Sequence, residues 1–119
     1  FDPTYPSVHD KMNAAFLNKG IVVTKYTGSR GKSSTNDANA EFMSKMRNLF
    51  DGAKVAWQTG ELGKVDEGGG GTVAKYVANL GVEVVDVGVP VLSMHAPFEV
   101  VAKLDVYMAF KGFKAFLEQ

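Results

Sequence analysis

The stretch that decides the fold reads Gly88-Val-Pro-Val-Leu-Ser-Met-His95-Ala-Pro-Phe-Glu-Val-Val101. It holds His95, one of only two histidines, after an apolar run and before the segment that predicts the last helix. Open α/β folds place their working residues at the carboxyl ends of strands. A histidine held here between two prolines is therefore a candidate functional side chain. The alternative is a histidine that caps the strand end or is hydrogen-bonded in a turn.

Upstream of this stretch, apolar runs alternate with helical periods. The β-branched run at residues 20–27 predicts a strand, and residues 1–19 predict a loop with one helical turn. A helix is expected to begin at a cap on Asn36 or Asp37 and to end at Gly52, which we expect to be a left-handed C-cap. Its apolar residues recur on one face of a 3.6-residue period: Phe42, Met43, Met46, Leu49 and Phe50.

The second half of the chain continues the alternation. Strands are expected at residues 53–59 and 82–87, with a helix at 72–80 that is closed by Gly81. Residues 91–93 predict a short strand and residues 98–101 an extended segment. The last helix is expected at residues 102–117. Its predicted buried residues are Val106, Phe110, Phe113 and either Phe116 or Leu117.

This order of strands and helices predicts the α/β class, a layered sheet with right-handed crossovers. The 119 residues suffice for one domain with a core, and no internal repeat or domain boundary is visible. The first residue is Phe1 and not Met, within a stretch that reads like the middle of a sequence. We therefore expect a piece of a longer chain.

Charge and composition narrow the functional classes. Thirteen basic and thirteen acidic residues cancel, which argues against a nucleic-acid or anionic-membrane partner. No apolar run approaches the roughly 20 residues that a membrane-spanning helix needs. Cysteine is absent, which excludes disulfides, thiol catalysis and thiolate metal sites, and is compatible with a cytoplasmic location.

Two stretches resemble nucleotide-binding motifs and depart from them. Residues 28–33 read Gly-Ser-Arg-Gly-Lys-Ser, but a P-loop requires glycine where Tyr26 stands. Gly68–Gly71 precede a helix, and Asp86 follows as the acidic residue of a dinucleotide fingerprint would, but Val73 occupies the place of the third glycine. Nucleotide binding is kept as a minor alternative.

The four consecutive glycines have two interpretations. Each costs roughly 1 kcal/mol in backbone entropy relative to alanine where order is required. They are either a flexible surface linker or a backbone that a ligand approaches closely, with amide hydrogens facing an anion or carbonyl. Thr72 and a helix follow directly, which favours the second interpretation.

Other polar residues carry weaker signals. Asp66 and Glu67 are candidate metal ligands or a general base, although solvated loop carboxylates are commoner. Lys25, at the end of the first strand, could meet a substrate carboxylate as a point charge or be an exposed edge lysine. His9 lies in a proline-rich loop and is expected at the surface.

Taken together, three segments resemble the carboxyl-terminal part of the M18 aminopeptidases, the aspartyl-aminopeptidase-like dizinc exopeptidases. They are Gly63-Lys-Val-Asp-Glu-Gly-Gly-Gly-Gly-Thr72, residues 84–99 with their Ser-Met-His-Ala-Pro-Phe-Glu motif, and the helix with Asp105-Val-Tyr107. The resemblance covers essentially the whole chain. It implies that residues 1–119 are the C-terminal segment of a dizinc aminopeptidase catalytic domain with a layered α/β/α, phosphorylase/hydrolase-like sheet.

The resemblance also assigns roles to residues. It implies that His95 is a zinc ligand, the last in chain order, and that Met94 stands beside it. The loop with Gly69, Gly70 and Thr72 would lie beside the substrate backbone. Lys25 matches a family lysine suited to an acidic first residue of the substrate. The chain departs from eukaryotic members at residues 26–32, which leaves the substrate preference open.

The resemblance further implies what this segment lacks. A dizinc site in the family uses a second histidine, a bridging aspartate, further carboxylates and a glutamate base, all upstream of Phe1. The expected function is therefore a zinc-dependent aminopeptidase that removes N-terminal residues from peptides, with this segment inactive alone. Complete family members form dodecamers, and we expect the segment to self-associate. The alternative is a non-catalytic α/β structural or interaction module.

Overall fold

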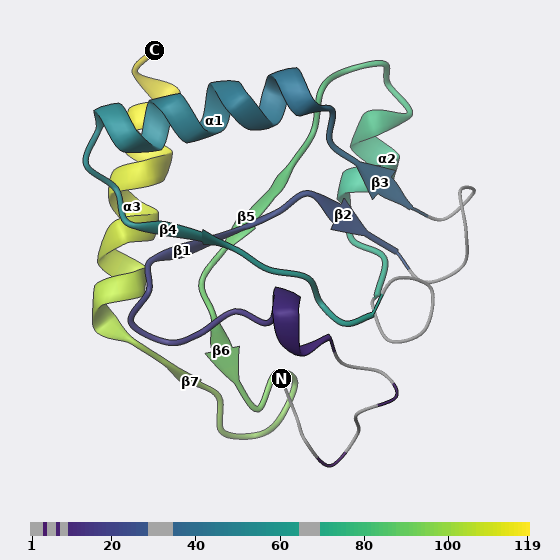
Figure 1. Ribbon diagram of the computed structural model, residues 1–119, viewed down its shortest axis with the longest axis vertical. Helices are drawn as coiled ribbons and strands as arrows, with labels where there is room; N and C mark the ends of the chain where they lie inside the picture. The colour runs from purple at the N-terminus through teal and green to yellow at the C-terminus, as the bar shows by residue number, and fades with distance from the viewer. Residues whose placement is uncertain (1–3, 5–6, 8–9, 29–34, 65–69) are drawn as a thin grey trace.

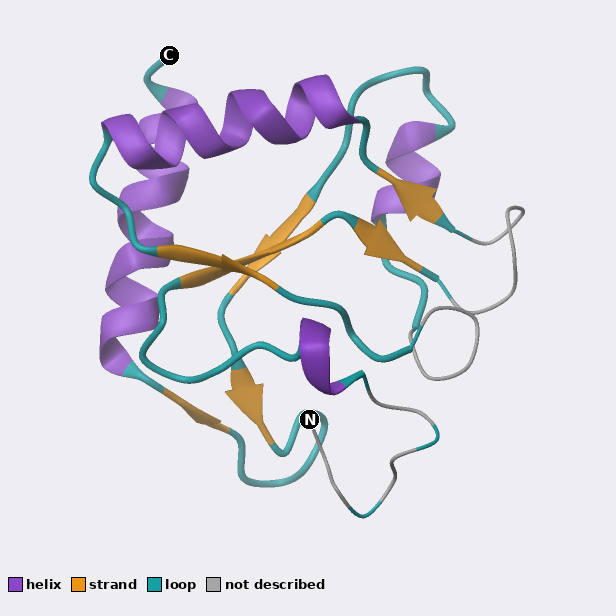
Figure 2. Cartoon of the chain, viewed as in Figure 1, coloured by secondary structure: helices purple, strands orange, loops and turns teal. Residues whose placement is uncertain are grey.

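The computed structural model describes residue 4, residue 7 and residues 10–28, 35–64 and 70–119 (Figure 1). The described elements comprise helices and short strands in alternation, which confirms the α/β class (Figure 2). In chain order they are η1 (Lys11–Asn13), β1 (Ile21–Thr24), β2 (Tyr26–Thr27), β3 (Asn36–Asp37), α1 (Ala40–Gly52), β4 (Trp57–Thr59), α2 (Ala74–Ala78), β5 (Asp86–Gly88), β6 (Val91–Leu92), β7 (Val100–Val101) and α3 (Lys103–Leu117).

The main sheet has three strands in the order β4-β1-β5. β4 runs parallel to β1, with Ile21 opposite Trp57, and the intervening chain forms α1. β5 runs antiparallel to β1, with Val22 opposite Gly88 and Thr24 opposite Asp86. The sequence pattern predicted crossover connections between parallel strands, and the antiparallel β5 corrects that expectation. β5 therefore carries the chain back toward the beginning of β1.

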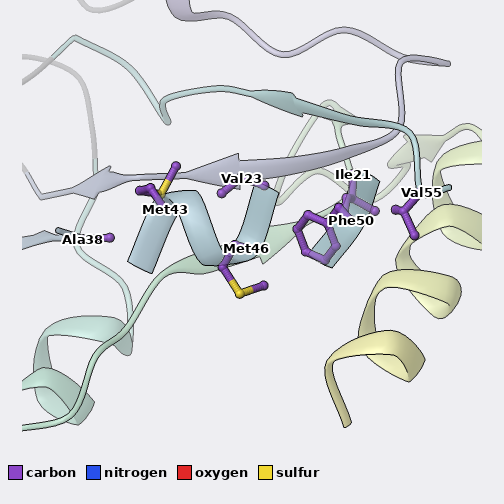
Figure 3. Close-up of a cluster of buried hydrophobic side chains, with 7 residues drawn as sticks. All are labelled: Ile21, Val23, Ala38, Met43, Met46, Phe50 and Val55. Atoms are coloured by element: carbon purple, nitrogen blue, oxygen red, sulfur yellow. The ribbon is translucent and has the colours of Figure 1, made fainter. Parts of the chain in front are cut away.

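The hydrophobic core lies between this sheet and α1 (Figure 3). Ile21 and Val23 are 0% and 1% exposed and project from the same face of β1, because alternate strand residues share a face. They meet Met43, Met46 and Phe50, which recur at helical spacing on the inner face of α1. The helical face predicted from the sequence is therefore the one that packs, with Phe42 and Leu49 half-buried at its margins.

The terminal helix α3 packs through a different face from the one predicted. Asp105 and Gly112 are buried, and Met108 and Ala109 pack against the core. These positions follow an i, i+3, i+4, i+7 spacing and form one face of the helix. The residues predicted to be buried are instead exposed at the surface: Val106 47%, Phe110 63%, Phe113 49%, Phe116 39% and Leu117 80%.

The physical reason for this correction is a polar anchor and a close contact. The carboxylate of Asp105 accepts hydrogen bonds from the backbone N–H groups of Asn18 and Gly20, at 2.8 Å each. A Cβ on Gly112 would lie 3.0 Å from Ile21 Cδ1 and 3.3 Å from Phe50 Cε1. The inner face is thus chosen by hydrogen bonding and by the absence of a side chain. A count of apolar residues detects neither.

Several element boundaries also differ from expectation. The first predicted strand is divided by a bend at Lys25 into β1 and β2. Gly52 lies inside α1 without a positive φ, and the left-handed residue after the helix is Lys54, with φ 54°. Gly81, which was predicted to close the helix that is α2, has a positive φ of 78°. In the next two predicted strands, 53–59 and 82–87, only residues 57–59 and 86–87 form sheet ladders, and the second ladder extends to Gly88.

Candidate functional site

His95 lies in the turn between β6 and β7, which pair antiparallel as a separate hairpin. Its φ is 67°, and that of Ser93 is 58°, so two residues of the turn adopt left-handed backbone. The backbone N–H of His95 donates to the carboxylate of Glu99, and Ala96 N donates to Ser93 O at 3.0 Å. These bonds hold the turn in a conformation that costs about 1–3 kcal/mol for a non-glycine residue. His95 itself is exposed, and so is Met94, at 54%.

Lys25 lies on the bend between β1 and β2. In Figure 1, β2 and the β6–β7 hairpin lie toward opposite ends of the main sheet. The Nζ of Lys25 forms an ion pair with the carboxylate of Asp37 on β3, the strand that pairs with β2. Their side chains are 45% and 59% exposed, so water screens the pair and it contributes little to stability. Lys25 also borders a hollow of about 450 Å³ that is lined by side chains of α1 and β4, among them Arg47 and Trp57. A substrate carboxylate would have to compete with Asp37 for this ammonium group.

Glu61, which sequence reasoning did not single out, adds a titratable group to this end of the sheet. Burial, and after it the nearby Asp37 carboxylate, raise the pKa of its carboxyl to about 7, against the opposing effect of Lys25. Its backbone N–H donates to Asn13 O at 2.8 Å, which ties the residue to the η1 segment. No sequence signal distinguishes Glu61, because its half-buried position depends on contacts between distant segments.

Gly70 and Thr72 stand just before α2. Gly70 is exposed, and a Cβ built on it would meet no atom within 4 Å. The hydroxyl of Thr72 is bonded to Asp86 Oδ2 at 2.9 Å and lies 3.2 Å from Thr27 Oγ1. The backbone at Gly70 is therefore accessible on the side where a Cβ would point. The hydroxyl of Thr72, in contrast, is already engaged by other residues of the protein.

The described residues bring some of the predicted site residues together and keep others apart. Thr72 lies beside β2, the strand that follows Lys25, through its contact with Thr27. The hairpin with Met94 and His95 follows β5, which leads away from this end of the sheet. Within the described chain, no hydrogen bond or ion pair joins Lys25 or Thr72 to this hairpin. Gly69, Asp66, Glu67 and His9 lie outside the described residues.

His95 is the only predicted zinc ligand among the described residues. Within the described ranges, no group of three or more His, Cys, Asp or Glu side chains converges on a point. Zinc sites in proteins use three or four such ligands. His95 can supply one imidazole nitrogen, and the described part of the chain does not form a metal site by itself. In the same part, no helix combines the length and apolarity needed to cross a membrane.

Solved structures of aminopeptidases share this architecture. The crystal structure of aminopeptidase I from Clostridium acetobutylicum superposes with a TM-score of 0.88 at 54% identity, covering 100% of this chain and 26% of that one. The M18-family aminopeptidase structure from Thermotoga maritima gives a TM-score of 0.87 at 46% identity, covering 98% of this chain and 26% of that one. The class of protein defined by the fold is thus that of the aminopeptidases.

The sequence comparisons identify the family within this class. The family model described as aminopeptidase I zinc metalloprotease (M18) matches residues 1–117, and the chain belongs to this family. A probable M18 family aminopeptidase 1 from Clostridium acetobutylicum is 55% identical over 117 residues, 98% of this chain and 25% of its own length. Aspartyl aminopeptidase 1 from Schizosaccharomyces pombe is 32% identical over 98% of this chain and 24% of its own length. The chain spans about a quarter of the length of these relatives.

Proposed function

We propose that this chain is the C-terminal segment of the catalytic domain of a metal-dependent aminopeptidase, which removes N-terminal residues from peptides. Family membership over residues 1–117 is the observation that carries the proposal. The segment supplies one zinc ligand and part of the substrate-binding surface. The remaining metal ligands come from parts of the protein outside the described residues.

His95 is the proposed zinc ligand. Left-handed backbone at a non-glycine residue is concentrated at functional sites, where the surrounding contacts maintain the strain. His95 combines such a φ of 67° with an exposed side chain and a backbone N–H held by Glu99. This arrangement fixes the direction in which the imidazole leaves the backbone. Zinc would act as a Lewis acid in the complete site.

The experiment that tests this proposal measures zinc content and activity in the full-length enzyme. We expect a His95→Ala variant to bind less zinc per chain and to lose most of its activity on aminoacyl anilides. The zinc content is measured by elemental mass spectrometry. A His9→Ala variant is the matched control, since the same residue type is removed at a position with no proposed metal role. Unchanged zinc content in His95→Ala would contradict the role of His95. An inactive parent enzyme with bound zinc would favour the non-catalytic module.

The substrate-binding surface is proposed to include Lys25, the loop with Gly69, Gly70 and Thr72, and Met94. The open space beside Gly70 supports close approach of a peptide backbone there. Lys25 would bind an acidic first side chain in competition with Asp37. A Lys25→Met variant should raise KM for Asp- and Glu-anilides and leave KM for Leu-anilide unchanged. An equal rise in KM for all of these substrates would contradict the proposed role of Lys25 in acidic-residue preference.

Homo-oligomerisation, with a dodecamer for the complete enzyme, is part of the same proposal. It is supported by the exposed apolar side chains on α3, of which Phe110 is 63% and Leu117 80% exposed. Large exposed apolar patches often mark interaction surfaces. Sedimentation analysis of the purified chain tests self-association, and a sharply monomeric profile would count against it. A cytoplasmic location, with which the absence of cysteine is compatible, stays a prediction.

A further inference from the structure

The hydroxyl of Thr72 is saturated by partners within the protein. Its oxygen lies 2.9 Å from Asp86 Oδ2, 3.2 Å from Thr27 Oγ1 and 3.2 Å from the backbone nitrogen of Ala74. A carboxylate can only accept, so the single hydroxyl hydrogen of Thr72 goes to Asp86. The two remaining lone pairs then accept the N–H of Ala74 and the O–H of Thr27. A substrate could bond to this hydroxyl only by displacing one of these partners.

The resulting row of hydrogen bonds has one donor-to-acceptor direction, and both of its outer residues lie on strands. It runs from the Thr27 hydroxyl through the Thr72 hydroxyl to the Asp86 carboxylate. Thr27 is 3% exposed on β2, and Asp86 is half-buried at the start of β5, where it pairs with Thr24 of β1. Both ends of the row are therefore held by strands. Its central member is the residue that terminates the glycine run.

Gly70 and Gly71 directly precede this anchored threonine. Both are exposed, and the position of a Cβ on Gly70 is open space. Glycine imposes no backbone preference of its own. The position of this backbone is therefore determined at the Thr72 end by side chains that belong to other elements.

We propose that Asp86 and Thr27 are positioning residues, which act through Thr72 to set the place of the Gly70–Gly71 backbone and thereby the affinity for a peptide substrate. This inference rests on the proposed function, in which the glycine run lies beside the substrate. It gives Thr72, a member of the proposed substrate-binding loop, a specific part: its hydroxyl holds the loop in place. Neither Asp86 nor Thr27 touches the substrate in this account.

The test compares variants of the full-length enzyme that keep or remove the hydroxyl. Thr72→Val preserves the side-chain shape and removes the hydrogen bonds, whereas Thr72→Ser keeps them. We expect Thr72→Val to raise KM for a Leu-anilide about tenfold, as for loss of a hydrogen bond to a charged group, with kcat changed less than about twofold. The Thr72→Ser variant, which keeps the hydroxyl, should have the KM of the parent enzyme. Thr27→Val and Asp86→Ala should raise KM in the same manner.

A control separates loop positioning from general loosening of the fold. Asn36 Nδ2 donates to Val84 O at 3.2 Å and links β3 to the segment before β5 without contacting Thr72. Asn36→Ala should therefore lower Tm while KM stays at the parent value. If Thr72→Val does not fold, Thr27→Val becomes the test variant. It removes only the hydrogen bond between the Thr27 and Thr72 hydroxyls.

The outcomes distinguish this inference from the function on which it rests. An active parent enzyme in which the valine variants keep the parent KM, whatever their Tm, would refute the positioning role alone. A KM that rises equally in Asn36→Ala would also refute it, since the effect would then be general loosening. A parent enzyme with bound metal and no aminopeptidase activity would refute the proposed function and this inference together.

Discussion

The carboxylate of Asp105, in the first turn of α3, accepts a 2.8 Å hydrogen bond from the backbone N–H of Gly20, which lies 85 residues earlier. Its other oxygen accepts from Asn18 N at 2.8 Å, and the side chain is 0% exposed. Gly20 has a φ of 93°, and a Cβ there would lie 2.0 Å from Ala56 O. One carboxylate thus fixes the tight turn that leads into β1.

Replacing Asp105 by asparagine should destabilise the protein strongly. The amide retains one acceptor oxygen and turns an NH₂ group toward a backbone N–H, so one buried donor loses its partner. We expect a loss of about 2–3 kcal/mol in the free energy of unfolding, measured by urea denaturation. Asp51→Asn is the matched control, because its exposed carboxylate accepts a bond from Trp57 Nε1 that an amide oxygen can replace. Equal denaturation midpoints for Asp105→Asn and the parent would contradict this account.

Replacing Gly112 by alanine should also destabilise the protein, although alanine favours helices by about 1 kcal/mol. The added Cβ would lie 3.0 Å from Ile21 Cδ1 and 3.3 Å from Phe50 Cε1, and those side chains are only 0% and 1% exposed. Because both side chains are packed in the core, we expect overpacking to exceed the propensity gain and leave a net loss of about 1 kcal/mol. Gly52→Ala, with no atom within 4 Å, should be neutral or slightly stabilising in the same unfolding experiment.

Glu61 should make stability depend on pH. Its carboxyl has an ordinary pKa of 4.5, and burial followed by repulsion from Asp37 raises the pKa to about 7 in the folded protein. The folded state therefore binds more protons than the unfolded state between these values. The free energy of unfolding should fall as pH rises through this window, with the favourable contribution fully present below the unfolded pKa.

The measurement for Glu61 is Tm across about pH 5 to about pH 8. Glu61→Gln should flatten the profile and exceed the parent at the alkaline end, because no buried carboxylate has to ionise. Glu41→Gln, at an exposed position in the first turn of α1, serves as the control and should keep the parental slope. Parallel profiles for the parent and Glu61→Gln would show that another group causes any pH dependence.

Asp37 should limit the ability of Lys25 to bind acidic substrates. In Asp37→Asn the ammonium group loses its ion-pair partner and becomes available to a substrate carboxylate. In the full-length enzyme, the ratio of kcat/KM for Asp-anilide to that for Leu-anilide should rise severalfold. Stability should change by less than about 1 kcal/mol, because the pair is exposed. Glu118→Gln, which removes the exposed pair with Lys114, should leave the ratio unchanged.

The sequence predicted the elements that follow a regular apolar period and missed those that depend on polar contacts between distant segments. The inner face of α1 could be identified from Met43, Met46 and Phe50 because core packing follows the 3.6-residue period. The inner face of α3 could not, because its packing depends on a buried carboxylate and on a glycine. The apolar pattern of Phe110 and Phe113 therefore pointed to the wrong side of the helix.

The candidate site shows the same division. Lys25 and the β6–β7 turn were found from their positions at strand ends. The partners that give them their properties, Asp37 and Glu99, carry no local signal. Asp86 was noticed only as part of an incomplete dinucleotide motif, while its actual partner, Thr72, became apparent only from the fold.

The antiparallel strand β5 sets the spacing between two parts of the candidate site, the loop end at Thr72 and the turn with His95. Asp86, at its start, holds Thr72, and the chain beyond Gly88 leads into the turn with His95. Each residue in an antiparallel strand advances the chain by about 3.4 Å and reverses the side-chain direction. Inserting or deleting one residue within β5 would therefore shift the following turn with His95 against Asp86 by about that step. If the glycine run and His95 act on one substrate, as proposed, the length of this segment matters more than the identity of its apolar residues.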